Sequence, residues 1–205
     1  MGVFSSGGIG IDMGSGSTAV YLENEGVKLR EPTCALVNRE NASDVLALGR
    51  DAQRMAGRTD DASILVAPVI DGGVADSELA AILMLSVAEK ACEKRRPFEK
   101  SRLAVTVPHG ATRVERAALA TATGLAGAKK ALIVKAPVAA AIGAGVRIDR
   151  PQGVLVISVG CAVTEISILS MNGVVASRTM KTGSMAFDEA IVRYIRRVKG
   201  LVISP

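Results

Sequence analysis

The sequence predicts a duplicated α/β fold, and two observations support this prediction. The first is an internal match between residues 10–22, GIDMGSGSTAVYL, and residues 156–169, VISVGCAVTEISIL. In each copy a short apolar strand ends in a small turn, which is followed by a Thr and a second apolar strand. The second observation is composition: 49% of the residues are hydrophobic but only 2% are aromatic. Small and branched side chains of this kind are typical of sheets covered by helices.

Three short strands are expected to open the first copy. Residues 8–13, 18–23 and 27–30 are joined by the sequences GSGS and NEGV, whose turn chemistry favours hairpins. The pattern in residues 33–68 is less regular. There we expect strands at TCALV, DVLAL and SILVAP and a short helix at RDAQRMAG.

Helices and strands are then expected to alternate. The segment that begins DSELAAIL has Asp76 as a candidate N-cap, apolar residues at helical spacing and basic residues at its end, which predicts a helix. A strand at 102–108 precedes a helix that Thr112 and Glu115 open in a capping-box pattern. A strand at 131–135 leads into APVAAAIGAGV, a helix of small residues that should pack closely against its neighbours.

The second half of the chain starts the same pattern again. Strands are expected at 153–159, 163–170 and 174–181, with the hairpin sequence SMNGVV between the last two. A helix from Ser184 to about Arg197 follows and carries apolar side chains on one side. Two units with the order β-β-β-α are therefore expected to face each other.

The two matching turns predict a phosphate cleft. Backbone N–H groups and hydroxyls of Gly- and Ser-rich turns bind phosphate oxygens, and an acid at the end of the first strand can hold water on a magnesium ion. Asp12 has this place in the first copy, whereas Ser158 has it in the second. A single Gly/Ser hairpin is a common structural turn, but a pair at matching places favours phosphate binding from both halves.

Charge and cysteine spacing argue against several other functions. The net charge of +5 permits contact with an acidic surface or a nucleotide, but no basic run is interleaved with aromatic residues, so we expect no nucleic-acid partner. Three widely spaced cysteines (Cys34, Cys92 and Cys161) and one histidine, His109, do not make a zinc site or a disulfide framework. We interpret His109 as an exposed loop residue. No apolar run reaches the length of a spanning helix and no signal pattern opens the chain, so a cytoplasmic protein is expected.

Seven segments of the chain resemble the MreB family, the bacterial actin homologues that organise rod-cell shape. They follow the family's order along essentially the whole chain: GIDMGSGSTAVYL, LREPTCALV, LALGRDAQRMAGRT, VIDGGVAD, VTVPHGATRVERAAL, APVAAAIGAGV and RYIRR. The resemblance implies an actin-like (ribonuclease H-like) duplicated fold whose second half is incomplete.

The same resemblance implies a division into domains. Residues 1–145 would form domain I, with subdomain IA at 1–32 and 69–145 and subdomain IB at 33–68. Residues 146–205 would form the opening part of subdomain IIA. Family members continue into the rest of IIA with its adenosine pocket, subdomain IIB and a closing helix, which we expect this chain to lack.

The resemblance also implies an ATP site with Mg²⁺. The family's first phosphate loop maps onto Asp12, Gly14, Ser15, Gly16, Ser17 and Thr18, and Asp12 would face the metal. Its second phosphate loop maps onto Ser158, Val159, Gly160, Cys161, Ala162, Val163 and Thr164.

Four positions depart from the family pattern. Ser158 replaces an Asp, and Ala136 replaces the Glu that polarises the attacking water. Cys161 and Ala162 carry side chains where bare glycine backbone lets phosphates come close. We therefore expect weak or no ATP binding and no measurable ATP hydrolysis by this chain.

A candidate membrane contact lies in residues 94–102, KRRPFEKSR, where the family has an apolar loop. Phe98 is interpreted as an apolar tip among basic side chains that would touch the inner membrane peripherally. An isolated exposed Phe with no function is the alternative.

Three functions stay open from the sequence. The first is an MreB-like filament subunit that binds adenine nucleotide and contributes to cell shape with cell-wall elongation proteins. The second is an actin-fold scaffold or binding module that no longer uses nucleotide. The third, which the two replaced acids disfavour, is an ATP-dependent enzyme of the sugar kinase and chaperone type.

Overall fold

A five-stranded mixed sheet forms the body of the first half of the molecule. The structure is a computed structural model that describes residues 7–56, 58 and 62–203. The strand order is β10-β9-β1-β2-β3, with β1, β2 and β3 antiparallel and with β9 and β10 parallel to β1. The strands are β1 (Gly8–Met13), β2 (Ser17–Leu22), β3 (Gly26–Pro32), β9 (Arg102–Val107) and β10 (Ala131–Lys135).

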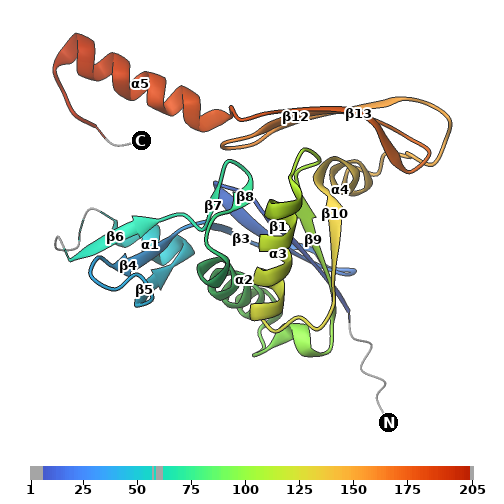
Figure 1. Cartoon of the computed structure of the whole chain (residues 1–205), viewed down its shortest axis with the longest axis horizontal. Coiled ribbons are helices and arrows are strands. Elements are labelled where there is room, and N and C mark those ends of the chain that lie inside the picture. The colour runs from blue at the N-terminus through green and yellow to red at the C-terminus, as the bar shows by residue number, and fades with distance from the viewer. Residues whose placement is uncertain (1–6, 57, 59–61, 204–205) are drawn as a thin grey trace.

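Two helices, α2 (Ser77–Cys92) and α3 (Arg113–Leu125), pack together over one face of this sheet (Figure 1). Both predicted caps are present. The Asp76 carboxylate accepts the N–H groups of Glu78 and Leu79, which satisfies donors that the helix itself leaves free. Thr112 and Glu115 make the full capping box.

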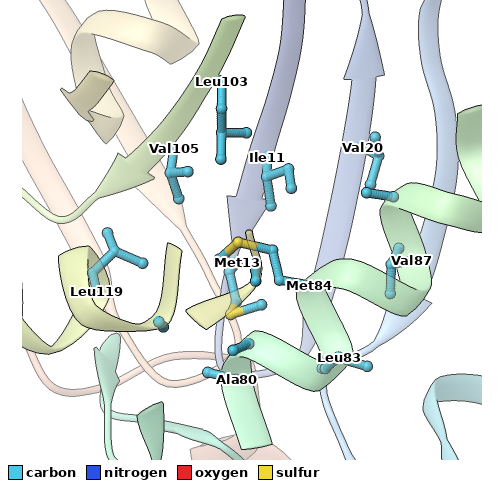
Figure 2. Close-up of a cluster of buried hydrophobic side chains, with 14 of the residues drawn as sticks. Ile11, Met13, Val20, Ala80, Leu83, Met84, Val87, Leu103, Val105 and Leu119 are labelled. Carbon is cyan, nitrogen blue, oxygen red and sulfur yellow. The ribbon is translucent and has the colours of Figure 1, made fainter. Parts of the chain in front are cut away.

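The main hydrophobic core lies between the sheet and these two helices. Alternation along β1 turns Ile11 and Met13 toward the helices, while Asp12 points to the other face. Figure 2 shows both side chains meeting Met84 of α2. The core therefore fixes which side chains of β1 are left for the opposite face, and Asp12 is one of them.

A second, smaller sheet opens the second half. It has the antiparallel order β11-β12-β13, made of β11 (Val154–Val159), β12 (Thr164–Ser170) and β13 (Gly173–Met180). The helix α4 (Ala136–Gly143) covers one face of it, where Ala141, Ile148 and Leu169 form a core cluster. The helix α5 (Ser184–Lys199) follows β13 and has no buried residue (Figure 1). Two three-stranded openings with hairpin turns confirm the duplicated α/β fold.

The remaining elements form a small body beside the main sheet. A three-stranded sheet has the order β5-β4-β6 and is followed by a two-stranded one, with these bounds: β4 (Ala35–Asn38), β5 (Val45–Leu48), α1 (Gly49–Met55), β6 (Ser63–Val66), β7 (Val69–Ile70) and β8 (Gly73–Val74). The predicted strands and short helix of this region are therefore present. Within the described ranges no helix combines the length and the apolarity needed to cross a membrane.

The predicted exposed tip at Phe98 is wrong. Phe98 lies in a single 3₁₀ turn, η1 (Pro97–Glu99), and only 3% of it is exposed because it packs into the main core. Arg96 takes a left-handed conformation before Pro97, which bends the loop back onto the end of α2. The loop's basic side chains stay at the surface, but its apolar one does not.

Candidate functional site

The two predicted phosphate turns have the same local structure. In the turn between β1 and β2, the N–H of Gly14 donates to the carbonyl of Ser17 at 3.0 Å. In the turn between β11 and β12, the N–H of Gly160 donates to the carbonyl of Val163 at 2.8 Å. Each turn thus closes over two residues between antiparallel strands, so the internal sequence match reflects a repeated structure.

Both turns line one cleft of about 300 Å³ between the halves of the molecule. The ends of β1 and β11 bring the turns to it, the start of α4 contributes Ala136, and the loops after β7 and β9 complete the wall. The residues of the two turns that line it are Gly14, Ser15, Gly16 and Ser17, and Gly160, Cys161, Ala162 and Val163. Asp12, Ser158 and Val159 line it as well.

Two predicted phosphate ligands do not line the cleft. Thr18 is fully buried, and its hydroxyl is 2.9 Å from the hydroxyl of Thr33. The hydroxyl of Thr164 donates to the carbonyl of Thr182 at 2.7 Å. Thr18 is the second residue of β2, and Thr164 is the first residue of β12. Both side chains therefore make hydrogen bonds within the protein close to the turn that precedes them. Of the residues assigned to the two phosphate loops, these two lie outside the cleft lining, and their role in phosphate binding stays a prediction.

The polar side chains of the first turn are already engaged. The hydroxyl of Ser15 accepts the N–H of Gly72 at 3.0 Å, and that of Ser17 accepts the guanidinium of Arg30 at 3.2 Å. The carboxylate of Asp12 accepts the hydroxyl of Thr106 on β9. These contacts hold the first turn in place and leave its backbone amides as the natural phosphate donors.

The two turns touch each other at Gly16 and Cys161. A Cβ atom placed on Gly16 would lie 2.7 Å from the Cβ of Cys161 and 2.9 Å from its sulfur, closer than real side chains approach. Any side chain at residue 16 would therefore force Cys161 or one of the turns to shift, because the Cys161 side chain occupies the space between the turns. The backbone N–H groups of Ser184 and Met185, at the start of α5, donate to the carbonyls of Gly160 and Cys161 in the second turn.

Ala136 and Ser158, the two positions at which the family resemblance implies an acid, both line the cleft. A methyl group cannot accept a proton, and a hydroxyl carries no charge to order water around a cation. Asp12 is then the acid that can face a metal from the first turn. Among the described residues no three His, Cys, Asp or Glu side chains gather as a ligand set for a metal ion.

The buried carboxylate of Glu165 forms part of the cleft wall. Glu165 on β12 is 5% exposed, and its Oε1 accepts the backbone N–H of His109 at 2.7 Å and the hydroxyl of Thr179 at 3.1 Å. His109 is half-buried rather than exposed, and its Nδ1 has no partner among the described residues. Burial lowers the pKa of His109, and the nearby cations Lys135 and Arg116 lower it further, against the opposite effect of Glu165.

Sequence reasoning missed six residues of the cleft wall: Met13, Arg30, Gly72, Thr106, Pro108 and Glu165. Four of them reach the cleft from loops or strands far away in sequence, and no local pattern marks them. Glu165 does have a signal, because it is an acid at an inward-facing position of the apolar strand TEISIL.

The model of the MreB/Mbl protein family matches residues 6–205 of this chain. The cell shape-determining protein MreB of Escherichia coli (strain K12) is 35% identical to it, and Mbl of Bacillus subtilis (strain 168) is 34% identical. The alignments cover 98% and 95% of this chain but 59% and 58% of those relatives. The chain thus spans about three fifths of the length of the curated relatives it matches.

Solved structures agree with the family match. The crystal structure of MreB5 of Spiroplasma citri bound to AMPPNP superimposes with a TM-score of 0.87 at 31% identity, over 98% of this chain and 60% of that one. The same protein bound to ADP gives a TM-score of 0.86 at 30% identity, over 98% of this chain and 59% of that one.

Proposed function

Because this chain belongs to the MreB/Mbl family and has its actin-like fold, we propose that it is a cytoskeletal subunit in cell-shape determination. We further propose that it binds adenine nucleotide between its two turns without hydrolysing it. The observation that supports this most directly is the pair of turns with the same closing hydrogen bond on one cleft. The nucleotides bound to the Spiroplasma relative supply the ligand class.

The residues that would hold the phosphates are those of the two turns. Backbone amides in the first turn would contact one side of the phosphate chain, and those of the second turn would contact the other. Asp12 would keep water on a magnesium ion, whose charge would offset that of the phosphates. Ser15 and Ser17 would position the first turn through Gly72 and Arg30 rather than bind phosphate themselves.

Hydrolysis should be absent because two groups in the cleft wall lack the necessary chemistry. Ala136 has no acceptor to orient an attacking water, and Ser158 has no charge to order the cation's shell. Loss of a water-orienting group alone typically costs about 10²–10⁴ in rate.

A phosphate-release assay and a binding titration with ADP and Mg²⁺ test the two parts of this proposal. The unmodified chain should bind ADP weakly and release no phosphate from ATP above the background rate. The double variant Ala136→Glu, Ser158→Asp should bind ADP and release phosphate measurably. Robust ATP turnover by the unmodified chain would show that these acids are dispensable and that the second turn has been misinterpreted.

A scaffold that no longer uses nucleotide is the second candidate. The observation that favours it is the contact of Cys161 with Gly16, which fills space between the turns. In that case neither ADP nor ATP should bind at millimolar concentration, and Cys161→Gly should not restore binding. Tighter ADP binding by Cys161→Gly would instead favour a nucleotide site that this side chain narrows.

Assembly and location belong to the same proposal. By extension from the family, the chain would self-associate into filaments on the cytoplasmic side of the inner membrane and work with cell-wall elongation proteins. A peripheral membrane contact would have to use the exposed basic residues of the loop and not Phe98: Lys94, Arg95, Arg96, Lys100 and Arg102.

A further inference from the structure

A buried carboxylate joins the two halves of the molecule at the wall of the cleft. Glu165 belongs to the second sheet, yet its Oε1 accepts the backbone N–H of His109, which lies in the loop between β9 and α3 of the first half. The hydroxyl of Thr179 on β13 donates to the same oxygen at 3.1 Å. We call this three-residue contact the clasp.

One hydrogen bond to Glu165 comes from within the second sheet, from Thr179, and another comes from His109 outside it. Alternation along β12 turns Glu165, Ser167 and Leu169 to one side, and Ile166 and Ile168 to the other. Leu169 fills a core cluster and Ser167 is 2.7 Å from Ser177 within the same sheet. Glu165 is the member of this row that reaches across to the first half. A carboxylate is costly to bury, so its two hydrogen bonds have to offset the loss of water.

The clasp lies next to the second phosphate turn. Glu165 pairs directly with Ser158 on β11, and both residues line the cleft. Pro108, next to His109, lines the cleft as well. A salt bridge between Lys181 and Asp71, at 3.6 Å, also joins the halves, at an exposed point. The buried hydrogen bond fixes its two partners more firmly than an exposed ion pair does.

We propose that Glu165 is a positioning residue that sets the separation of the two phosphate turns by clasping the β9–α3 loop to the second sheet. The effect on nucleotide rests on the proposed function above, but the clasp itself does not. The carboxylate does not need to touch the nucleotide. It holds the second turn at the distance from the first at which both can contact one phosphate chain.

Amide hydrogen exchange at His109 tests the clasp without any ligand. Glu165→Ala should raise the exchange rate of this amide roughly tenfold, because its hydrogen-bond acceptor is gone. Glu165→Gln keeps an acceptor oxygen and should restore the slow rate. Ser167→Ala is the matched control, since it removes a buried polar group from the same strand and the same face whose hydrogen bond, to Ser177, stays within the second sheet.

ADP affinity tests the positioning role in the same four proteins. Glu165→Ala should weaken ADP binding by about three- to tenfold, while Glu165→Gln and Ser167→Ala should bind like the unmodified chain. If the Ala variant does not fold, Glu165→Asp, which is one methylene shorter, should show both effects.

Three results separate this proposal from the proposed function. An unchanged exchange rate in Glu165→Ala, or an equal rise in Ser167→Ala, would overturn the clasp. Faster exchange with unchanged ADP affinity would reduce the contact to a structural one and would overturn the positioning role. An unmodified chain that does not bind ADP would overturn the proposed nucleotide function, and the exchange rates would still decide whether the clasp holds the halves together.

Discussion

The surroundings of His109 come from both halves of the molecule. It is the chain's single histidine, and its Nδ1 is buried with no partner among the described residues. Burial and the cations Lys135 and Arg116 disfavour the protonated ring, while the carboxylate of Glu165 favours it. The first two effects prevail, so the pKa of His109 in the folded protein is lowered.

We expect the pKa of His109 to lie below its ordinary value of 6.5. The unfolded chain takes up a proton near the ordinary value, whereas the folded chain does so only at lower pH. Stability linked to His109 is therefore complete above 6.5 and is lost as the pH falls toward the folded pKa. An NMR titration of the single imidazole checks the direction, and His109→Asn should lose less stability than the unmodified chain between pH 7 and pH 5. An imidazole pKa at or above 6.5 would contradict this.

Sequence reasoning at the residue scale found the turns but not every side chain's direction. The sequence predicts the turns at Gly14 and Gly160 because a Gly in a tight turn between apolar strands is a local signal. Thr18 and Thr164 lie beside those turns, and which way a strand residue points depends on which face the core occupies. The prediction that Phe98 is exposed is wrong for the same reason. The loop's sequence shows an apolar residue among charges, but the bend that buries this residue depends on α2 and the core.

Helix ends are the features that this sequence specifies best at the scale of elements. The predicted caps at Asp76 and Thr112 are both present, because the side chain and the amides that it satisfies lie within three residues of each other. The wall of the cleft is the opposite case. Arg30, Gly72 and Thr106 reach it from three separate elements, and only the assembled sheet brings them together.

Thr112→Ala should destabilise the protein by about 0.5–2 kcal/mol, because it removes the cap that accepts the N–H of Glu115. Thr121→Ala is the matched control, since Thr121 is exposed inside the same helix and Ala is the better helix former there. Urea unfolding of both variants measures the difference. Equal stability of the two would mean that the box adds nothing to α3.

The distribution of apolar surface distinguishes the two halves at the scale of the whole molecule. The first half has a large core under α2 and α3, whereas the outward face of the second sheet leaves Leu155 60% exposed and Ile157 59% exposed. Helix α5 exposes Phe187 to 69% and Ile191 to 55%. Apolar patches of this extent favour association.

We expect the 205-residue chain to self-associate reversibly through these surfaces. The double variant Phe187→Ser, Ile191→Ser should shift sedimentation velocity profiles toward the monomer, since each buried side chain of this size contributes about 1.5–3 kcal/mol. Val114→Ser is the control, because Val114 on α3 of the first half is 77% exposed, more than either test residue. A chain that stays monomeric at high concentration before any substitution would contradict the expectation.

The central claim is that the two turns of the internal repeat face each other across one cleft, and a designed disulfide tests it most directly. In a chain with Cys34→Ser and Cys92→Ser, Gly16→Cys places a thiol against Cys161, and a modest widening of about 1 Å brings the Cβ atoms to disulfide distance. Ser43→Cys, in the distant turn between β4 and β5, is the control. Mild oxidation should link residues 16 and 161 within one chain, as peptide mass spectrometry would show, and should leave the control unlinked. Two free thiols after oxidation, or links formed only between chains, would contradict the account.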